Sequence, residues 1–362
     1  MGTLAQGLRK HLLLFLPLVG ALILSAGCGS SSQSNPIVSW PSNQSVYVSQ
    51  STEVNSFLIS SSLAKSGNAA PTTALTATTF MDTHRTAFDS LGRMYETDLN
   101  TGSVFIFPSG ATTGSVAPTA TIAMTAPAGN GDATASGIAI DSSNNVYVSD
   151  EGNNAIDVYS AVAADATGTL AASPVYTIYG ASTTLNAPNG IALNSTGTKL
   201  WVANEAGDDV LCFTLPTAVV SGAQNLAPTA TITNSAFSTV HSLALDSTDL
   251  VYVTNSSTTS SAVFVYSPSS NGVATPVSII SGNKTGLSGL NGISLDSEGN
   301  IYVGNNYVVT TSGKTTNAAE ILVFPAGSTG NVPPGFIIGG SNTGLTPTIH
   351  GVTVGPIPTP ET

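Results

Sequence analysis

The chain has 362 residues, of which only 8% are charged, and a formal net charge of −12. So few Lys and Arg residues argue against nucleic acid or anionic lipid headgroups as partners, because both need basic clusters. The chain has two cysteines, Cys28 and Cys212. If Cys28 is used as an anchor, no internal disulfide is possible, and we expect Cys212 to be a small buried hydrophobic residue in the segment Val210–Phe213.

The first 27 residues are typical of a secretory signal. Arg9 and Lys10 precede an apolar run from Leu12 to Leu24, which is too short for a comfortable membrane span of roughly 20 residues. The segment L-S-A-G-C that ends at Cys28 resembles a bacterial lipoprotein signal, although Ser25 stands where that family usually has Leu. The alternative is an ordinary signal peptide cut nearby. The resemblance implies lipidation of Cys28, a Ser-rich tether over 28–44, and an exported protein held in the cell envelope by its lipid alone.

One unit recurs along the rest of the chain. Its copies start at Arg85, Gly137, Gly190, Ser242 and Gly292, with separations of 50 to 53 residues. A fixed period of this size indicates a repeat architecture in which each unit packs on its neighbours.

Each unit predicts four strands. Two short runs rich in β-branched residues flank a turn, a third run follows, and a Gly-to-Pro spacer precedes the fourth. Four antiparallel strands repeated radially are the blades of a β-propeller. Six spacers, six second strands and six first strands predict an all-β protein of six four-stranded blades over 45–355. The C-terminal strand 350–355 would complete the first blade, and 356–362 would be a tail. The alternative is that 37–40 supplies that strand.

The repeat core G-I-A-I-D-S-S-N-N-V-Y-V-S-D at 137–150 resembles the NHL repeat, and the resemblance extends over nearly the whole segment 45–355. It implies a six-bladed propeller and leaves function open. Such propellers include protein-binding and RNA-binding modules, metal-dependent lyases and relatives among lactonases. The RNA-binding members use a basic face, which this chain lacks.

Alignment of the repeats brings three histidines to one position, just before the first strand. Because the first strand of a blade is innermost, we expect this channel-mouth set to converge on the axis: His84, Ser136, Asn189, His241, Asn291 and His350. Three imidazoles are a ligand set typical of catalytic zinc, and the resemblance to the lyases carries a site for zinc or another divalent metal onto His84, His241 and His350. These histidines do not lie on alternate blades. Two His ligands with water or Asn, an organic ligand or peptide, and a polar channel without metal therefore remain open.

A strand-end set lies on the same face, at the end of each second strand: Gln50, Asp98, Asp150, Asn204, Asn255 and Asn305. Asp98 and Asp150 are candidates to orient histidines or to act as acid–base groups, and they could equally stabilise turns. Arg85 replaces Gly or Ser at its repeat position. It could bind a ligand carboxylate, or pair with Asp82 or Asp98.

Two functions fit these observations. The first is a lipid-anchored monomer that binds a protein, peptide or glycan in the envelope. The second is a metal-assisted lyase or hydrolase at the channel mouth. No G-x-S-x-G, H-E-x-x-H or P-loop motif occurs in the chain.

Overall fold

The computed structural model describes residues 38, 41, 43–60, 67–111, 114–127, 130–170, 173–218, 220–257, 260–311 and 314–358. The proposed signal, Cys28 and most of the tether lie outside these residues. Asn35–Thr362 forms one compact unit. Within the described residues, none of the helices is long and apolar enough to cross a membrane.

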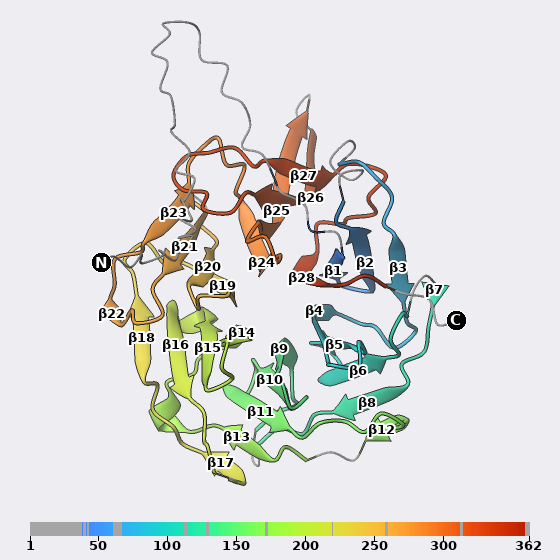
Figure 1. Ribbon diagram of the computed structural model, residues 1–362, viewed down its shortest axis with the longest axis vertical. Coiled ribbons are helices and arrows are strands. Elements are labelled where there is room, and N and C mark those ends of the chain that lie inside the picture. Colours follow the sequence, from blue (N-terminus) through green and yellow to red (C-terminus); the bar gives the residue numbers. More distant parts are fainter. Residues whose placement is uncertain are drawn as a thin grey trace, which may run out of the picture. The chain divides into compact units, whose positions relative to one another are not determined.

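Six sheets surround a central channel, so the predicted six-bladed propeller is confirmed (Figure 1). We number the blades by their first strands, which line the channel: β28 (Ile349–Pro356), β4 (Thr83–Phe88), β9 (Ala135–Ile140), β14 (Pro188–Leu193), β19 (Val240–Leu245) and β24 (Gly289–Leu295). The second strands, in the same order, are β1 (Gln44–Gln50), β5 (Met94–Asp98), β10 (Val146–Asp150), β15 (Lys199–Asn204), β20 (Val251–Asn255) and β25 (Ile301–Thr311).

The two outer strands of each blade follow the same order. The third strands are β2 (Glu53–Leu58), β6 (Ser103–Phe107), β11 (Ala155–Tyr159), β16 (Asp209–Thr214), β21 (Ala262–Tyr266) and β26 (Lys314–Phe324). The fourth strands are β3 (Thr73–Thr76), β8 (Ala120–Ala123), β13 (Tyr176–Ile178), β18 (Ala230–Thr233), β23 (Ser278–Ser281) and β27 (Phe336–Gly339). The described helices are two short 3₁₀ turns, η2 (Ala181–Thr183) and η3 (Glu205–Gly207).

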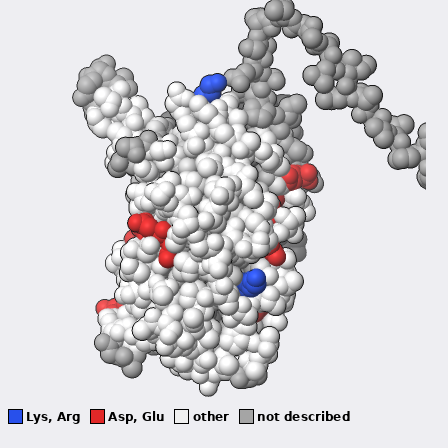
Figure 2. Space-filling view, turned by 90° about the vertical axis from the view of Figure 1, so that its left-hand side faces the viewer, with Lys and Arg blue, Asp and Glu red and all other residues white. Residues whose placement is uncertain are grey.

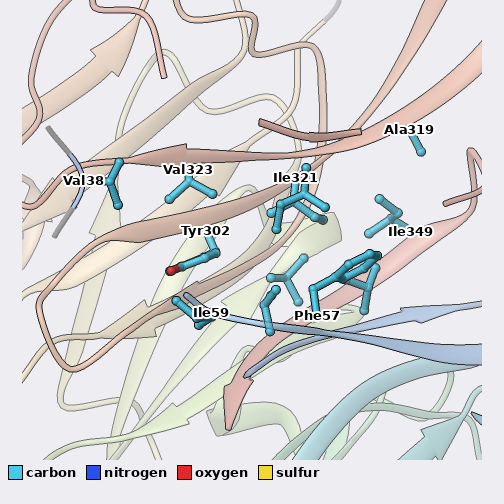
Figure 3. Close-up of a cluster of buried hydrophobic side chains, with 12 residues drawn as sticks. Val38, Phe57, Ile59, Tyr302, Ala319, Ile321, Val323 and Ile349 are labelled. Carbon is cyan, nitrogen blue, oxygen red and sulfur yellow. The ribbon is translucent and has the colours of Figure 1, made fainter. Parts of the chain in front are cut away.

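The two ends of the ring meet in blade 1, as predicted. β28 pairs antiparallel with β1, and Val354 and Val352 lie opposite Val46 and Val48. A buried cluster joins this blade to blade 6, with Phe57, Ile59 and Ile349 against Tyr302, Ile321 and Val323 (Figure 3). Burial of each such side chain stabilises the fold by about 1.5–3 kcal/mol. The closure of the ring is therefore stabilised by apolar packing as well as by the hydrogen bonds between β28 and β1.

Each blade has the four predicted strands, and four of the sheets gain a fifth from the next repeat. The Gly-to-Pro spacers form short strands that pair in parallel with the fourth strand of the preceding blade: β7 (Gly114–Ser115), β12 (Gly168–Leu170), β17 (Gly222–Gln224) and β22 (Gly272–Val273). The first residue of each has a positive φ, between 66° and 98°, which glycine adopts without strain. In these four repeats the spacer therefore pairs with the outer edge of the preceding blade.

β25 and β26 have 11 residues each and extend beyond the other strands of the ring (Figure 1). Their pairing continues from Asn305 opposite Glu320 to Thr311 opposite Lys314. Asn305 marks the end where the channel-mouth set lies, so the extra length projects on that face. The surface carries few charges, and Figure 2 shows only scattered acidic and basic residues on one side.

Candidate functional site

Every first strand shifts its register by one residue near its start. The extra residue of each bulge falls at the channel-mouth set, which therefore lies inside the strands rather than just before them. A β-bulge changes the direction of a side chain without ending the strand, and all six first strands have such a bulge beside their channel-mouth residue. The sequence register placed these six residues correctly at equivalent positions.

His84 and His350 come from neighbouring blades, and their rings stack with centroids 4.4 Å apart and an interplanar angle of 12°. Asp82, two residues before His84, completes a group. Its carboxylate oxygens lie 3.3 Å from Nε2 of His350 and 4.0 Å from Nε2 of His84. One ligand atom from each residue lies within 4.8 Å of the others.

Two imidazoles and a carboxylate form a donor set that suits zinc and non-haem iron. Ligand atoms at about 2.1 Å from one ion lie at most about 4.2 Å apart, so Asp82, His84 and His350 must close slightly to bind it. His241, the third predicted ligand, is absent from this group, and Asp82 takes its place. Blades 1 and 2 are adjacent, whereas blade 5 lies opposite blade 2.

Burial keeps both imidazoles of the stacked pair neutral. The pKa of His84 is lowered to about 2, first by desolvation and then by the charges of His350 and Arg85. The pKa of His350 is lowered to about 4, first by desolvation and then by the charge of Arg85. Burial and the nearby Asp98 raise the pKa of Asp82. Neutral imidazole is the form that binds a metal, so protons compete for these histidines only in acid.

The opposite side of the mouth carries a second polar group, centred on Asn189. Its Nδ2 lies 2.9 Å from Oε2 of Glu205, 3.5 Å from Oε2 of Glu151 and 3.4 Å from Nδ1 of His241. His241 also approaches Glu205 at 3.5 Å. Burial raises the pKa of both glutamates, and it lowers that of His241 to about 4. The remaining members of the set bond to neighbours, Ser136 Oγ to His84 Nδ1 and Asn291 Nδ2 to the Ile349 carbonyl.

Arg85 crosses the channel beneath the mouth. Its guanidinium donates from Nη1 to the carbonyls of His84 and His350, and from Nη2 to Oδ1 of Asn189, 3.0 Å away. The residue is only 7% exposed, and burial lowers its pKa to about 10, so it stays charged. Among the described residues, Asp82 and Asp98 form no ion pair with Arg85, contrary to one of the two roles considered for it.

The strand-end set is buried and holds the loops that lead into the first strands. Asp98 accepts from the backbone N–H groups of Met81 and Asp82 through Oδ2, and from that of Thr101 through Oδ1. Asp150 accepts from Thr134 N–H and from Asn153. Both carboxylates therefore act on loops, and Asp98 positions the backbone of Asp82.

Blade 2 departs from the repeat just below the histidine pair. Glu96 stands where the other second strands have Val, and Thr86 stands where the other first strands have Ile, Leu or Val. Thr86 Oγ1 donates to Oε2 of Glu96 at 2.6 Å and lies 3.1 Å from Ser49 Oγ. Burial raises the pKa of Glu96 to about 8. Polar departures thus cluster in the sector that holds Asp82, His84 and His350.

Sequence reasoning missed Asp82, Glu151, Glu205 and Glu96. Glu151 directly follows Asp150, and Glu205 directly follows Asn204. The repeat alignment therefore contained a third set of equivalent positions at the mouth, one residue after the strand-end set. Glu96 was visible as an acidic residue at a Val position. Asp82 left no comparable signal, because its approach to His350 depends on the loop that Asp98 holds.

A family model described as "Lactonase, 7-bladed beta-propeller" matches residues 93–223, about a third of the chain. No curated protein matches. A protein of unknown function from Bacteroides caccae has a TM-score of 0.59, with 14% identity over 86% of this chain and 99% of its own. A putative 6-phosphogluconolactonase from Bacteroides fragilis has a TM-score of 0.54, with 12% identity over 86% and 98%. A nidogen/laminin complex gives 0.53, with 12% identity over the same shares. At such identities these similarities show the β-propeller fold alone.

Proposed function

We propose that this chain is an exported, lipid-anchored propeller of the NHL-repeat type that binds a protein, peptide or glycan of the cell envelope at its channel mouth, as a monomer. The observation that carries the proposal is the concentration of polar chemistry there. In a chain with 8% charged residues, Asp82, Glu151 and Glu205 meet three histidines at one end of the channel. The long β25–β26 hairpin projects on the same face and enlarges the surface available to a partner.

The charge of the mouth favours a partner with a cationic group. The mouth has three carboxylates, hydrogen bonds already engage the guanidinium of Arg85 beneath it, and the histidines are neutral near pH 7. An amine-bearing peptide or an amino sugar has the complementary charge, and the acidic net charge of the chain favours its approach.

Calorimetric titration of the purified protein with tetralysine and with tetraglutamate tests this proposal. We expect tetralysine alone to bind, with an affinity that falls as salt rises. The double variant Glu151→Gln/Glu205→Gln should weaken binding at least tenfold. Asp165→Asn, an exposed acid in the loop after the third strand of blade 3, is the matched control and should bind as the parent does. Equal binding by the double variant and the parent would refute the proposal.

A second candidate function is metal-assisted hydrolysis or lyase chemistry, and the Asp82–His84–His350 group favours it. A bound divalent metal would supply a Lewis acid and an acidified water. His241 is neutral and lies beside Glu205, so it is placed to take up a proton across the mouth. The lactonase family match over 93–223 makes lactones the first substrates to assay.

Metal content separates the two candidates. If the enzymatic candidate is right, plasma mass spectrometry should find close to one zinc or other divalent ion per chain after incubation and desalting, and the variant His84→Ala/His350→Ala should lose it. His241→Ala should keep it, because His241 lies outside the group. A protein that stays metal-free in zinc would eliminate the enzymatic candidate.

A further inference from the structure

A cavity of about 430 Å³ occupies the central channel below the mouth, within the range of about 300–1,000 Å³ that small-molecule sites show. First strands of all six blades line it, from Arg85 at one end to Phe88 and Pro356 at the other. None of the six channel-mouth residues lines it. The cavity therefore lies on the far side of the Arg85 side chain from the mouth, and it is distinct from the site proposed above.

Most of the side chains that line this cavity are apolar, among them those of Ile140, Leu193, Leu245 and Val354. Three of the polar side chains in the wall, those of Thr86, Thr353 and Ser294, are engaged by hydrogen bonds. Thr353 Oγ1 donates to the Thr86 carbonyl, and Ser294 Oγ accepts from the Val354 N–H. Such side chains favour contact with a hydrocarbon chain.

Arg85 is the exception at the inner end. Three of the five guanidinium N–H groups are engaged, two from Nη1 and one from Nη2, whereas Nε is buried and has no hydrogen-bond partner. Nε and Nη2 share the edge through which a guanidinium binds a carboxylate side-on. No carboxylate of the described residues lies within ion-pair distance of Arg85. A buried cation without a direct counterion favours an anion that reaches it.

We propose that the channel binds an aliphatic carboxylate of medium length, with its headgroup at the guanidinium of Arg85, which lines the cavity, and its tail along the apolar side chains of the wall. A singly charged carboxylate matches one guanidinium edge, whereas a phosphate dianion needs more donors than this site has free. From Arg85 to Phe88 the strand rises roughly 10 Å, which suits a tail of about eight carbons.

Isothermal titration of the purified protein with a series from acetate to decanoate, in detergent-free buffer, tests this. We expect one site per chain and an affinity that rises about fourfold for each added methylene until the cavity is full. Methyl octanoate, which has the same tail without the charge, should bind at least tenfold more weakly than octanoate. This comparison also separates a free acid from an esterified lipid chain.

Two variants locate the ligand. Arg85→Gly installs the residue that four other blades carry at this position, so the fold should persist, which thermal unfolding will show, and octanoate affinity should fall at least tenfold. Ala139→Leu narrows the wall and keeps the guanidinium, so the gain in affinity with chain length should disappear. Undiminished octanoate binding by Arg85→Gly would overturn the proposal, as would acetate binding as tightly as octanoate, or no octanoate binding at millimolar concentration.

Discussion

Glu96 makes the stability of this propeller depend on pH in a way that can be calculated. The residue is fully buried between blades 1 and 2 and accepts a hydrogen bond from Thr86, while its other carboxyl oxygen has no partner. Desolvation raises its pKa from 4.5 to about 8. The folded protein therefore holds the Glu96 proton more tightly than the unfolded chain does.

The sign and size of the effect follow from this difference. Well below pH 4.5 the carboxyl is protonated in both states and contributes no pH dependence. As pH rises toward 8, the unfolded chain releases the proton and the folded protein does not, so the free energy of unfolding falls. One pKa unit corresponds to about 1.4 kcal/mol, so between pH 5 and pH 7 the loss is about 3 kcal/mol.

Denaturant unfolding at pH 5, 6, 7 and 8, followed through the fluorescence of buried Trp201, measures this loss. Glu96→Gln and Glu96→Val, the latter restoring the residue of the other blades, should remove about 3 kcal/mol of the pH dependence and raise stability at pH 7. Glu298→Gln, at an exposed glutamate, serves as the control. If parent and Glu96→Gln lost stability in parallel from pH 5 to pH 7, the assignment of a protonated Glu96 would be wrong.

Three further perturbations test the architecture. Asp98→Asn should cost about 1 kcal/mol, because its amide oxygen can still accept from Met81 and Asp82 whereas its amide nitrogen cannot accept from Thr101. Asp98→Ala should cost about 2–4 kcal/mol, because it leaves all three backbone N–H groups without this acceptor; equal denaturation midpoints for the two variants would contradict this reasoning. Gly137→Ala places a Cβ 2.2 Å from the Asn189 carbonyl oxygen and should lower the melting temperature by several degrees, and an unchanged value would argue against that close approach. Deletion from Ile349 onward removes β28 and should make blade 1 sensitive to limited proteolysis; full resistance would show that closure through β1 is dispensable.

Much of the fold follows from the repeat. Its period and the matching counts of strands predict six blades, and a first strand that appears only at 350–355 predicts closure through blade 1. Cys212 is buried in β16, as expected of a small apolar residue. The spacers were visible as a pattern, but their pairing with the preceding blade involves residues about 40 to 50 positions apart, and two or three residues carry no strand signal of their own.

The site was predictable only in part. A shared register places His84 and His350 on one rim, because equivalent positions of a radial repeat must converge. The repeat alignment does not show which residues of the channel-mouth set contact each other. The rings of His84 and His350 stack because blades 1 and 2 are neighbours. Asp82 reaches His350 because Asp98 holds the loop that carries Asp82. The sequence left a site with two His ligands open, because the three histidines do not lie on alternate blades, but it did not name Asp82 as the third member of the group.

The short spacer strands have a consequence for the protein in a crowded setting. The outermost strand of a blade would otherwise present a row of unpaired backbone groups, a template on which a second molecule could add its own strand. β7, β12, β17 and β22 cap four of these edges with a segment donated by the next repeat. At the other two, Gly330 bridges to Ile280 and Gly339 donates to the Gly67 carbonyl. These short segments leave little regular edge on which a second molecule could add a strand, so we expect them to disfavour edge-to-edge aggregation in a chain with few surface charges.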